Sequence, residues 1–69
     1  MRLTRVHSRA VDAIGYEPVE RMLVVRFLSG ETYEYLDVDP SLFHALMNSA
    51  HPWTEYGDRV KAHEFRHVG

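Results

Sequence analysis

The segment from Leu23 to Tyr35 constrains the fold more than any other part of the chain, because its apolar residues alternate with polar ones on both sides of a glycine. Such period-two alternation is typical of strands with one buried face. The side chains that must share this face are Leu23, Val25, Phe27, Tyr33 and Tyr35. The segment therefore predicts a β-hairpin.

The length of the loop decides the register of this hairpin. A two-residue loop of Ser29 and Gly30 would place Phe27 opposite Thr32, which would leave the tyrosines on the wrong face. A three-residue loop that begins at Leu28, with Gly30 in the left-handed conformation, keeps all five side chains on one face. We predict this second loop, and its cross-strand pairs are Val25 with Tyr33 and Leu23 with Tyr35.

Two further segments precede the hairpin. Residues 1–9 alternate weakly and are expected to form a flexible arm or an edge strand. Residues 10–16 predict a strand with an irregular start near Ser8, and Glu17 and Pro18 open a turn because proline favours extended geometry in the residue before it. Together with the hairpin, residues 10–35 predict a three-stranded antiparallel meander.

The segment after the hairpin predicts an amphipathic helix. Asp39 is a good N-cap, and Pro40 suits the first helical position because its missing N–H has no partner there. The helix should end near Ser49, before Pro52. Its apolar stripe consists of Leu42, Phe43, Leu46, Met47 and Ala50. Packing this stripe on the hairpin gives a two-layer α+β domain over residues 1–69.

The C-terminal third is less regular. Thr54 is expected to cap a shorter second helix that ends near Ala62, although Gly57 weakens this helix by about 1 kcal/mol relative to alanine. Residues 64–68 fit either a last helical turn or a short terminal strand.

Composition excludes several classes of protein. The chain has 69 residues, enough for one small domain, and its hydrophobic content of 45% is typical of a folded globule. It contains no cysteine, which excludes disulfides and thiolate catalysis and fits a cytoplasmic location. No apolar run is long enough to span a bilayer, and the arginines near the start are not followed by the apolar core of a signal peptide.

Charge is unevenly distributed although the net charge is only −2. Residues 1–11 carry three arginines and no acid, residues 12–39 carry seven acids and two arginines, and the remainder is balanced. A nucleic-acid-binding protein usually shows a clear basic excess. Here a basic patch requires the two ends of the chain to meet, and its candidate residues are Arg2, Arg5, Arg9, Arg59, Lys61 and Arg66.

The order of these motifs resembles the KTSC domain, a small module named for its occurrence at the C-terminus of some lysyl-tRNA synthetases and also found as stand-alone bacterial and phage proteins. The matching positions are Val6-x-Ser8, Val11-x-x-Ile14-Gly15-Tyr16-Glu17-Pro18, Leu23-x-Val25-x-Phe27-x-x-Gly30, Tyr33-x-Tyr35, Val38-x-Pro40, Phe43 and Leu46. The chain departs from the family pattern at Ser8-Arg9 and at residues 51–54. The resemblance implies no catalytic residue, and it implies RNA contact only through the association with a synthetase.

The sharpest literal motif is HExxH, formed by His63, Glu64 and His67. In zinc peptidases two histidines one helical turn apart hold the metal, and the glutamate acts as general base. Here no residue downstream supplies a third ligand, and the charge of Arg66 opposes a divalent cation. If residues 64–68 form a strand, the two histidines lie roughly 13 Å apart and do not chelate. We therefore interpret the motif as a chance match, and expect neither a metal nor a cofactor.

Two non-enzymatic binding functions compete, and a zinc peptidase at the HExxH motif is a distant third. In the first, the basic residues at the two ends contact RNA or DNA beside Trp53. In the second, the domain docks on another protein, as an accessory or phage-type modulator, through Trp53, Tyr56 and the charged C-terminal segment. Phe27, Tyr33 and Tyr35 could form a base-stacking platform, but the predicted register assigns them to the core. No membrane or small-molecule partner is indicated.

Overall fold

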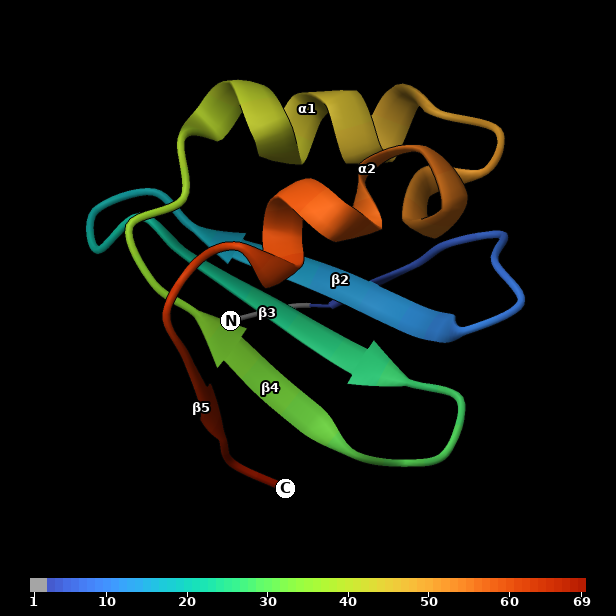
Figure 1. Ribbon diagram of the computed structural model, residues 1–69, viewed down its shortest axis with the longest axis horizontal. Coiled ribbons are helices and arrows are strands. Elements are labelled where there is room, and N and C mark those ends of the chain that lie inside the picture. Colours follow the sequence, from blue (N-terminus) through green and yellow to red (C-terminus); the bar gives the residue numbers. More distant parts are fainter. Residues whose placement is uncertain (1–2) are drawn as a thin grey trace.

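The computed structural model describes residues 3–69, which form a five-stranded antiparallel sheet with two helices on one face (Figure 1). The strands are β1 (Thr4–Arg5), β2 (Val11–Glu17), β3 (Met22–Phe27), β4 (Thr32–Tyr35) and β5 (Phe65–His67). The helices are α1 (Pro40–Asn48) and α2 (Pro52–Lys61), and both lie between β4 and β5 in sequence. The order of strands in the sheet is β1-β2-β3-β4-β5.

The α+β class is confirmed, but the predicted sheet of three strands is too small. β1 adds two residues at one edge, and β5 adds three residues at the other. The segment 64–68, which fitted a helical turn or a strand, therefore contains a strand. Residues 1–9, predicted as a flexible arm or an edge strand, contain the edge strand β1. Both added strands are exposed along their whole length, so neither has the clear apolar alternation of a half-buried strand.

The hairpin register is confirmed. Val25 lies opposite Tyr33 and Leu23 lies opposite Tyr35. The three-residue loop closes through a hydrogen bond of 2.8 Å from the Phe27 N–H to the Glu31 carbonyl, and Gly30 has a positive φ of 98°. Glycine adopts this conformation without the steric cost that a Cβ imposes.

The irregular start of β2 is also confirmed. The register with β3 shifts between Val11 and Ala13, so that Asp12 lies in a bulge. Just before this bulge, the Ser8 hydroxyl accepts hydrogen bonds from the backbone N–H groups of Ala10 and Val11 at 3.2 and 3.3 Å. Ser8 therefore fixes the turn that leads into the strand.

The core lies between the sheet and the helices. Leu23 and Val25 of β3 and Ile14 of β2 point toward the helices and have no exposed surface. From the helices, Leu46 and Val60 are buried against them. Because side chains alternate along a strand, Val24 and Arg26 of β3 point to the opposite face, which no helix covers (Figure 1).

α1 begins as predicted. Asp39 accepts a hydrogen bond of 2.8 Å from the Ser41 N–H, which lowers the pKa of the Asp39 carboxyl, and Pro40 occupies the first turn. In the predicted stripe Leu46 is buried, and Leu42, Phe43 and Met47 pack partly buried against the core. Ala50 lies beyond the end of the helix and is exposed, so its inclusion in the stripe was wrong.

α2 begins three residues earlier than predicted. His51 is at the N-cap position and makes no side-chain capping bond, and Pro52 is buried in the first turn. Thr54, the predicted cap, therefore lies inside the helix. Proline at the first helical position thus determines this helix start, as it does in α1. Neither helix among the described residues is long and apolar enough to cross a membrane.

Candidate aromatic pocket

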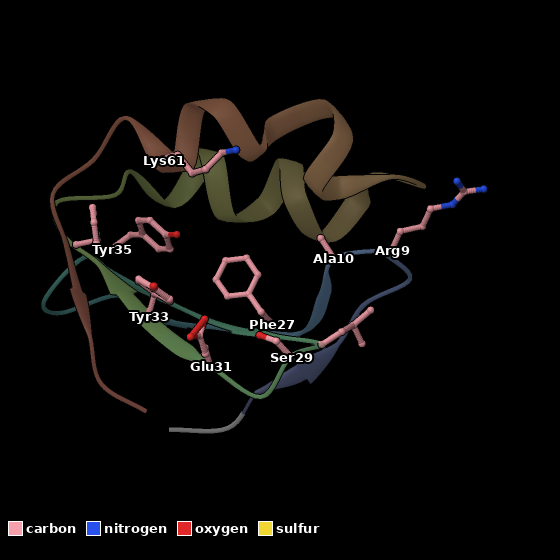
Figure 2. A pocket seen from close by; sticks show the side chains of 10 residues that line it. Arg9, Ala10, Phe27, Ser29, Glu31, Tyr33, Tyr35 and Lys61 are labelled. Carbon is pink, nitrogen blue, oxygen red and sulfur yellow. The ribbon is translucent and has the colours of Figure 1, made fainter.

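The main cavity of the described residues opens on the helix side of the sheet, between the end of α2 and the strands β3, β4 and β5 (Figure 2). Its volume is about 590 Å³. We call it the aromatic pocket, and its apolar lining consists of Ala10, Phe27, Leu28, Tyr33, Tyr35 and Phe65. Its polar lining consists of Arg9, Ser29, Glu31 and Lys61.

Four aromatic rings form the floor and one side of the pocket. Phe27 meets Tyr33 edge to face, with ring centroids 5.6 Å apart. Phe65 lies 5.6 Å from Tyr33 and 6.0 Å from Tyr35, measured between ring centroids. The hairpin register produces this cluster, because it places Tyr33 and Tyr35 on the same face as Phe27.

The rings are buried to different extents. Tyr35 is only 4% exposed, and burial raises the pKa of its hydroxyl. Phe27 and Tyr33 are only partly buried. Two apolar side chains of the lining are strongly exposed, Leu28 at 57% and Phe65 at 58%. The pocket is therefore an apolar surface that faces solvent, and such surfaces often mark interaction sites.

Polar groups of both signs surround this apolar floor. Figure 2 shows Lys61 at the upper edge, the Glu31 carboxylate at the lower edge, and Arg9 extending away from the cavity. Lys61 pairs with Asp58 on the same helix at 3.7 Å, and both groups are exposed, so water screens this pair. The ammonium group of Lys61 is thus accessible to a ligand in the pocket.

The structure does not bring the predicted basic residues together on one surface. Arg9 and Lys61 both line the aromatic pocket, whereas Arg59 is exposed on α2. Arg5 pairs in register with Ala13, and Ala13 pairs with Arg26, so these residues lie on the sheet face opposite the helices. Arg66, at the other edge of the sheet, pairs with Glu34 on that same face. Arg2 lies outside the described residues.

The arginines of the open sheet face are paired with acids. Arg26 forms an ion pair of 2.9 Å with Asp12, the bulge residue, and Arg5 lies 3.8 Å from the same carboxylate. Arg66 forms an ion pair of 2.8 Å with Glu34. Each of these acids reduces the positive potential that its arginine presents to a ligand.

Trp53 and Tyr56, the predicted anchors, are half-buried and pack against the core. The Trp53 ring meets Phe27 edge to face at 5.3 Å and also covers Gly57, where an added Cβ would lie 3.1 Å from the indole. Gly57 therefore leaves room for the tryptophan one helical turn earlier. Trp53 does not itself line the cavity, but it packs against Phe27, which does.

The HExxH residues point to separate places. The Nδ1 of His63 lies 3.1 Å from the Leu36 carbonyl, while the His67 ring stacks on Tyr33 with centroids 4.6 Å apart. Since β5 begins at Phe65, the two histidines are not one helical turn apart. Residues 3–69 contain no cluster of three or more metal-ligating His, Cys, Asp or Glu side chains.

Sequence reasoning missed the pocket because it assigned Phe27, Tyr33 and Tyr35 wholly to the core. Tyr35 is buried as predicted, but all three side chains line the cavity, and Phe27 and Tyr33 are only partly buried. Two residues carried the missing signal. Leu28 sits in a tight loop and Phe65 lies in a charged terminal segment, and both are large apolar side chains without an evident partner.

Comparison with known proteins agrees with this architecture. A solved KTSC domain protein from Yersinia pestis superposes with a TM-score of 0.90 and 28% identity, covering 99% of this chain and 97% of that one. A protein of Tsukamurella paurometabola is 45% identical over 42 residues, and this match spans 61% of the chain and 63% of the relative. An uncharacterized protein of Stutzerimonas stutzeri is 27% identical over 67 residues, which cover 97% of the chain and 94% of the relative.

The family model of the KTSC domain matches residues 7–65. This match contains all five elements from β2 to α2, together with the aromatic residues of the pocket. The resemblance drawn from the sequence motifs is confirmed, and the chain belongs to the KTSC domain family.

Proposed function

We propose that this domain is a protein-binding module that accepts a large apolar side chain of its partner in the aromatic pocket. The observation that carries the proposal is an open cavity with an aromatic floor, flanked by the exposed side chains of Leu28 and Phe65. Covering these two side chains on binding removes apolar surface from water, which favours association. The proposed role is binding and involves no catalysis.

The chemistry of the pocket suits a large apolar anchoring side chain, and its size leaves room for the residues beside that anchor. Its volume of about 590 Å³ lies in the range of roughly 300–1,000 Å³ that is usual for ligand sites. A tryptophan, phenylalanine or leucine of the partner would meet the faces and edges of Phe27, Tyr33 and Phe65. Buried aromatic anchors of this kind supply most of the binding energy at many protein interfaces.

The charges at the edge of the pocket indicate which type of residue the partner carries beside its apolar anchor. Lys61 reaches the upper edge from the last turn of α2, so an acidic group beside the anchor gains an opposite charge. The expected partner sequence is therefore a large apolar residue with an aspartate or glutamate close to it. An electrostatic contact at the rim chiefly adds specificity and speeds association.

The distribution of arginines favours a protein partner over a nucleic acid. Arg5 and Arg66 lie on the sheet face away from the pocket, and each has an acidic partner there. A phosphate backbone needs several free cations along one track. The pocket itself is lined by an acid, Glu31, as well as by Lys61 and Arg9, which suits a mixed-charge peptide better than a polyanion.

A selection of displayed random peptides on the immobilised domain tests this function. We expect enriched sequences to share an aromatic or large aliphatic residue next to an acid. The Leu28→Ser variant should weaken their binding about tenfold, because it removes apolar area worth roughly 1–2 kcal/mol. Lys61→Glu should weaken binding roughly threefold and relax the preference for an acid.

Val19→Ser is the matched control. Val19 is 88% exposed, and it lies in the turn between β2 and β3, at the other end of β3 from Leu28 (Figure 1). Its replacement should leave binding unchanged. Equal losses in Leu28→Ser and Val19→Ser, or enriched peptides without an apolar anchor, would refute the proposed pocket.

A further inference from the structure

β5 ends the sheet with an unpaired edge. The Leu36 N–H donates to the Glu64 carbonyl at 2.8 Å, and the Val68 N–H donates to the Thr32 carbonyl at 2.9 Å. In an antiparallel pair the bonded residues alternate along the strand. The backbone groups of Phe65 and His67, between these bonds, therefore point away from β4, and no strand of the described residues lies beyond them.

The sequence along this edge is symmetric about Phe65. The residues on either side of Phe65 are Glu64 and Arg66, which have opposite charges. The next residues outward are both histidines, His63 and His67. When two copies pair antiparallel with Phe65 opposite Phe65, each Glu64 lies opposite the Arg66 of the other copy. Each His63 then lies opposite a His67. The segment that spells HExxH is thus complementary to itself.

The side chains of β5 agree with such pairing. Phe65 is 58% exposed on the helix side of the sheet, where it lies beside Tyr35, its partner in register. Glu64 and Arg66 lie on the opposite face, and Glu64 has no ion-pair partner among residues 3–69. A second copy would place its own Phe65 beside this one and supply Glu64 with a cation.

We propose that the domain forms a symmetric dimer through β5, in the register that places Phe65 opposite its copy. The two sheets then form one continuous sheet of ten strands, twice the five of one chain. The Phe65 N–H of each copy donates to the Phe65 carbonyl of the other, and two Glu64–Arg66 pairs flank this centre. The interface is isologous, because both copies contribute the same residues.

Charge reversal tests the register by analytical ultracentrifugation. In a dimer of one variant, Glu64→Arg places a new arginine opposite Arg66, and Arg66→Glu places a new glutamate opposite Glu64. We expect each variant alone to dimerise at least about tenfold more weakly, because two attractive cross-strand pairs become repulsive. An equimolar mixture of the two variants restores opposite charges at both positions and should dimerise at least as well as the original chain.

A register centred on Arg66 gives a different pattern. There Arg66 faces its own copy, so Glu64→Arg has no effect on dimerisation. A monomeric original chain at the highest concentrations used for NMR, or variants that dimerise equally well, would overturn the proposal. The variant Arg59→Glu, which reverses an exposed charge on α2, provides the control for a change of net charge.

Cysteine cross-linking gives a second measurement that does not depend on the Arg66–Glu34 pair. The chain has no cysteine, so the variant Phe65→Cys has a single thiol. In the proposed register the two Cα atoms at position 65 lie about 5.5 Å apart, which a disulfide spans. We expect mild oxidation to cross-link Phe65→Cys much faster than Val19→Cys, and equal rates would refute the dimer.

The dimer and the proposed protein-binding function fail separately. Leu28→Ser should weaken peptide binding and leave the dimer intact. Leu28 lies in the loop between β3 and β4, whereas the dimer forms through β5, which lies on the other side of β4. Glu64→Arg should weaken the dimer and leave the pocket lining unchanged. Peptide binding that survives Leu28→Ser would refute the pocket alone, and dimerisation that survives Glu64→Arg would refute the dimer alone.

Discussion

At the scale of single residues, Tyr16 joins the sheet to the segment that precedes α1. Its hydroxyl donates a hydrogen bond of 2.5 Å to the Val38 carbonyl, and its ring stacks on Phe43 with centroids 5.1 Å apart. Val38 is fully buried, so the chain between β4 and α1 is held at this point. The tyrosine therefore acts through both its ring and its hydroxyl.

We expect Tyr16→Phe to lower the free energy of unfolding by about 0.5–1.5 kcal/mol, because it removes the hydrogen bond and keeps the ring. Urea denaturation measures this loss. Tyr56→Phe is the control, since Tyr56 is half-buried on the core and has no hydrogen bond from its hydroxyl within residues 3–69. Equal losses in the two variants would show that the Val38 contact contributes nothing.

The pH dependence of Tyr16 follows from its burial. Burial raises the pKa of its hydroxyl above the usual 10.0, although the charge of Arg21 opposes this shift. A pKa raised by folding gives a stability contribution that is complete below the unfolded pKa and is lost as the pH rises through the folded one. The original chain should therefore lose stability above about pH 10 more steeply than Tyr16→Phe does.

At the scale of elements, the turn at Gly30 sets the register of the central hairpin. With two residues in the loop, Phe27 would leave the face that it shares with Tyr33, and the aromatic pocket would not form. Gly30 has open space around its Cα, with no heavy atom within 4 Å of a Cβ built there. Only its φ of 98° resists substitution.

Gly30→Ala should therefore destabilise the domain by roughly 1–2 kcal/mol through backbone strain alone. Thermal denaturation followed by circular dichroism measures the change, and Ser29→Ala in the same loop is the control. A loss no larger than that of Ser29→Ala would mean that the loop relaxes to another turn. In that case NMR contacts between Val25 and Tyr33 would also be lost.

At the scale of the whole molecule, the fold keeps apart the basic residues near the two ends of the chain, which the sequence alone allowed to form one patch. Arg5 lies at one edge of the sheet and Arg66 at the other, because β1 and β5 are the outermost strands. Both point away from the helices, whereas Lys61 lies on the helix side. The cations therefore form no single track.

We accordingly expect weak binding to a generic single-stranded oligonucleotide even at low salt. Fluorescence anisotropy of a labelled oligonucleotide measures it, at salt concentrations between about 50 and 200 mM. Tight binding that falls steeply over this range would favour the nucleic-acid hypothesis. Arg5→Ala and Arg66→Ala would then show which face carries the contact.

The sequence by itself determined the elements that have a repeating apolar pattern or a specific terminal residue. Alternation and Gly30 predicted the central hairpin with its register, and Asp39 and Pro40 predicted the start of α1. These signals are local, since they depend on neighbours a few residues away in the chain. The family resemblance also depended on them, because most of its motif positions lie in these elements.

The tertiary structure alone decided the edges of the sheet and the surfaces between elements. β1 and β5 are short and exposed, so the sequence left each segment open between a strand and another form. They form strands because β2 and β4 offer backbone groups that need partners. Likewise, Phe27 and Tyr33 line a pocket only because the helices leave part of the sheet uncovered. Such features depend on contacts between residues far apart in sequence, and no local pattern encodes them.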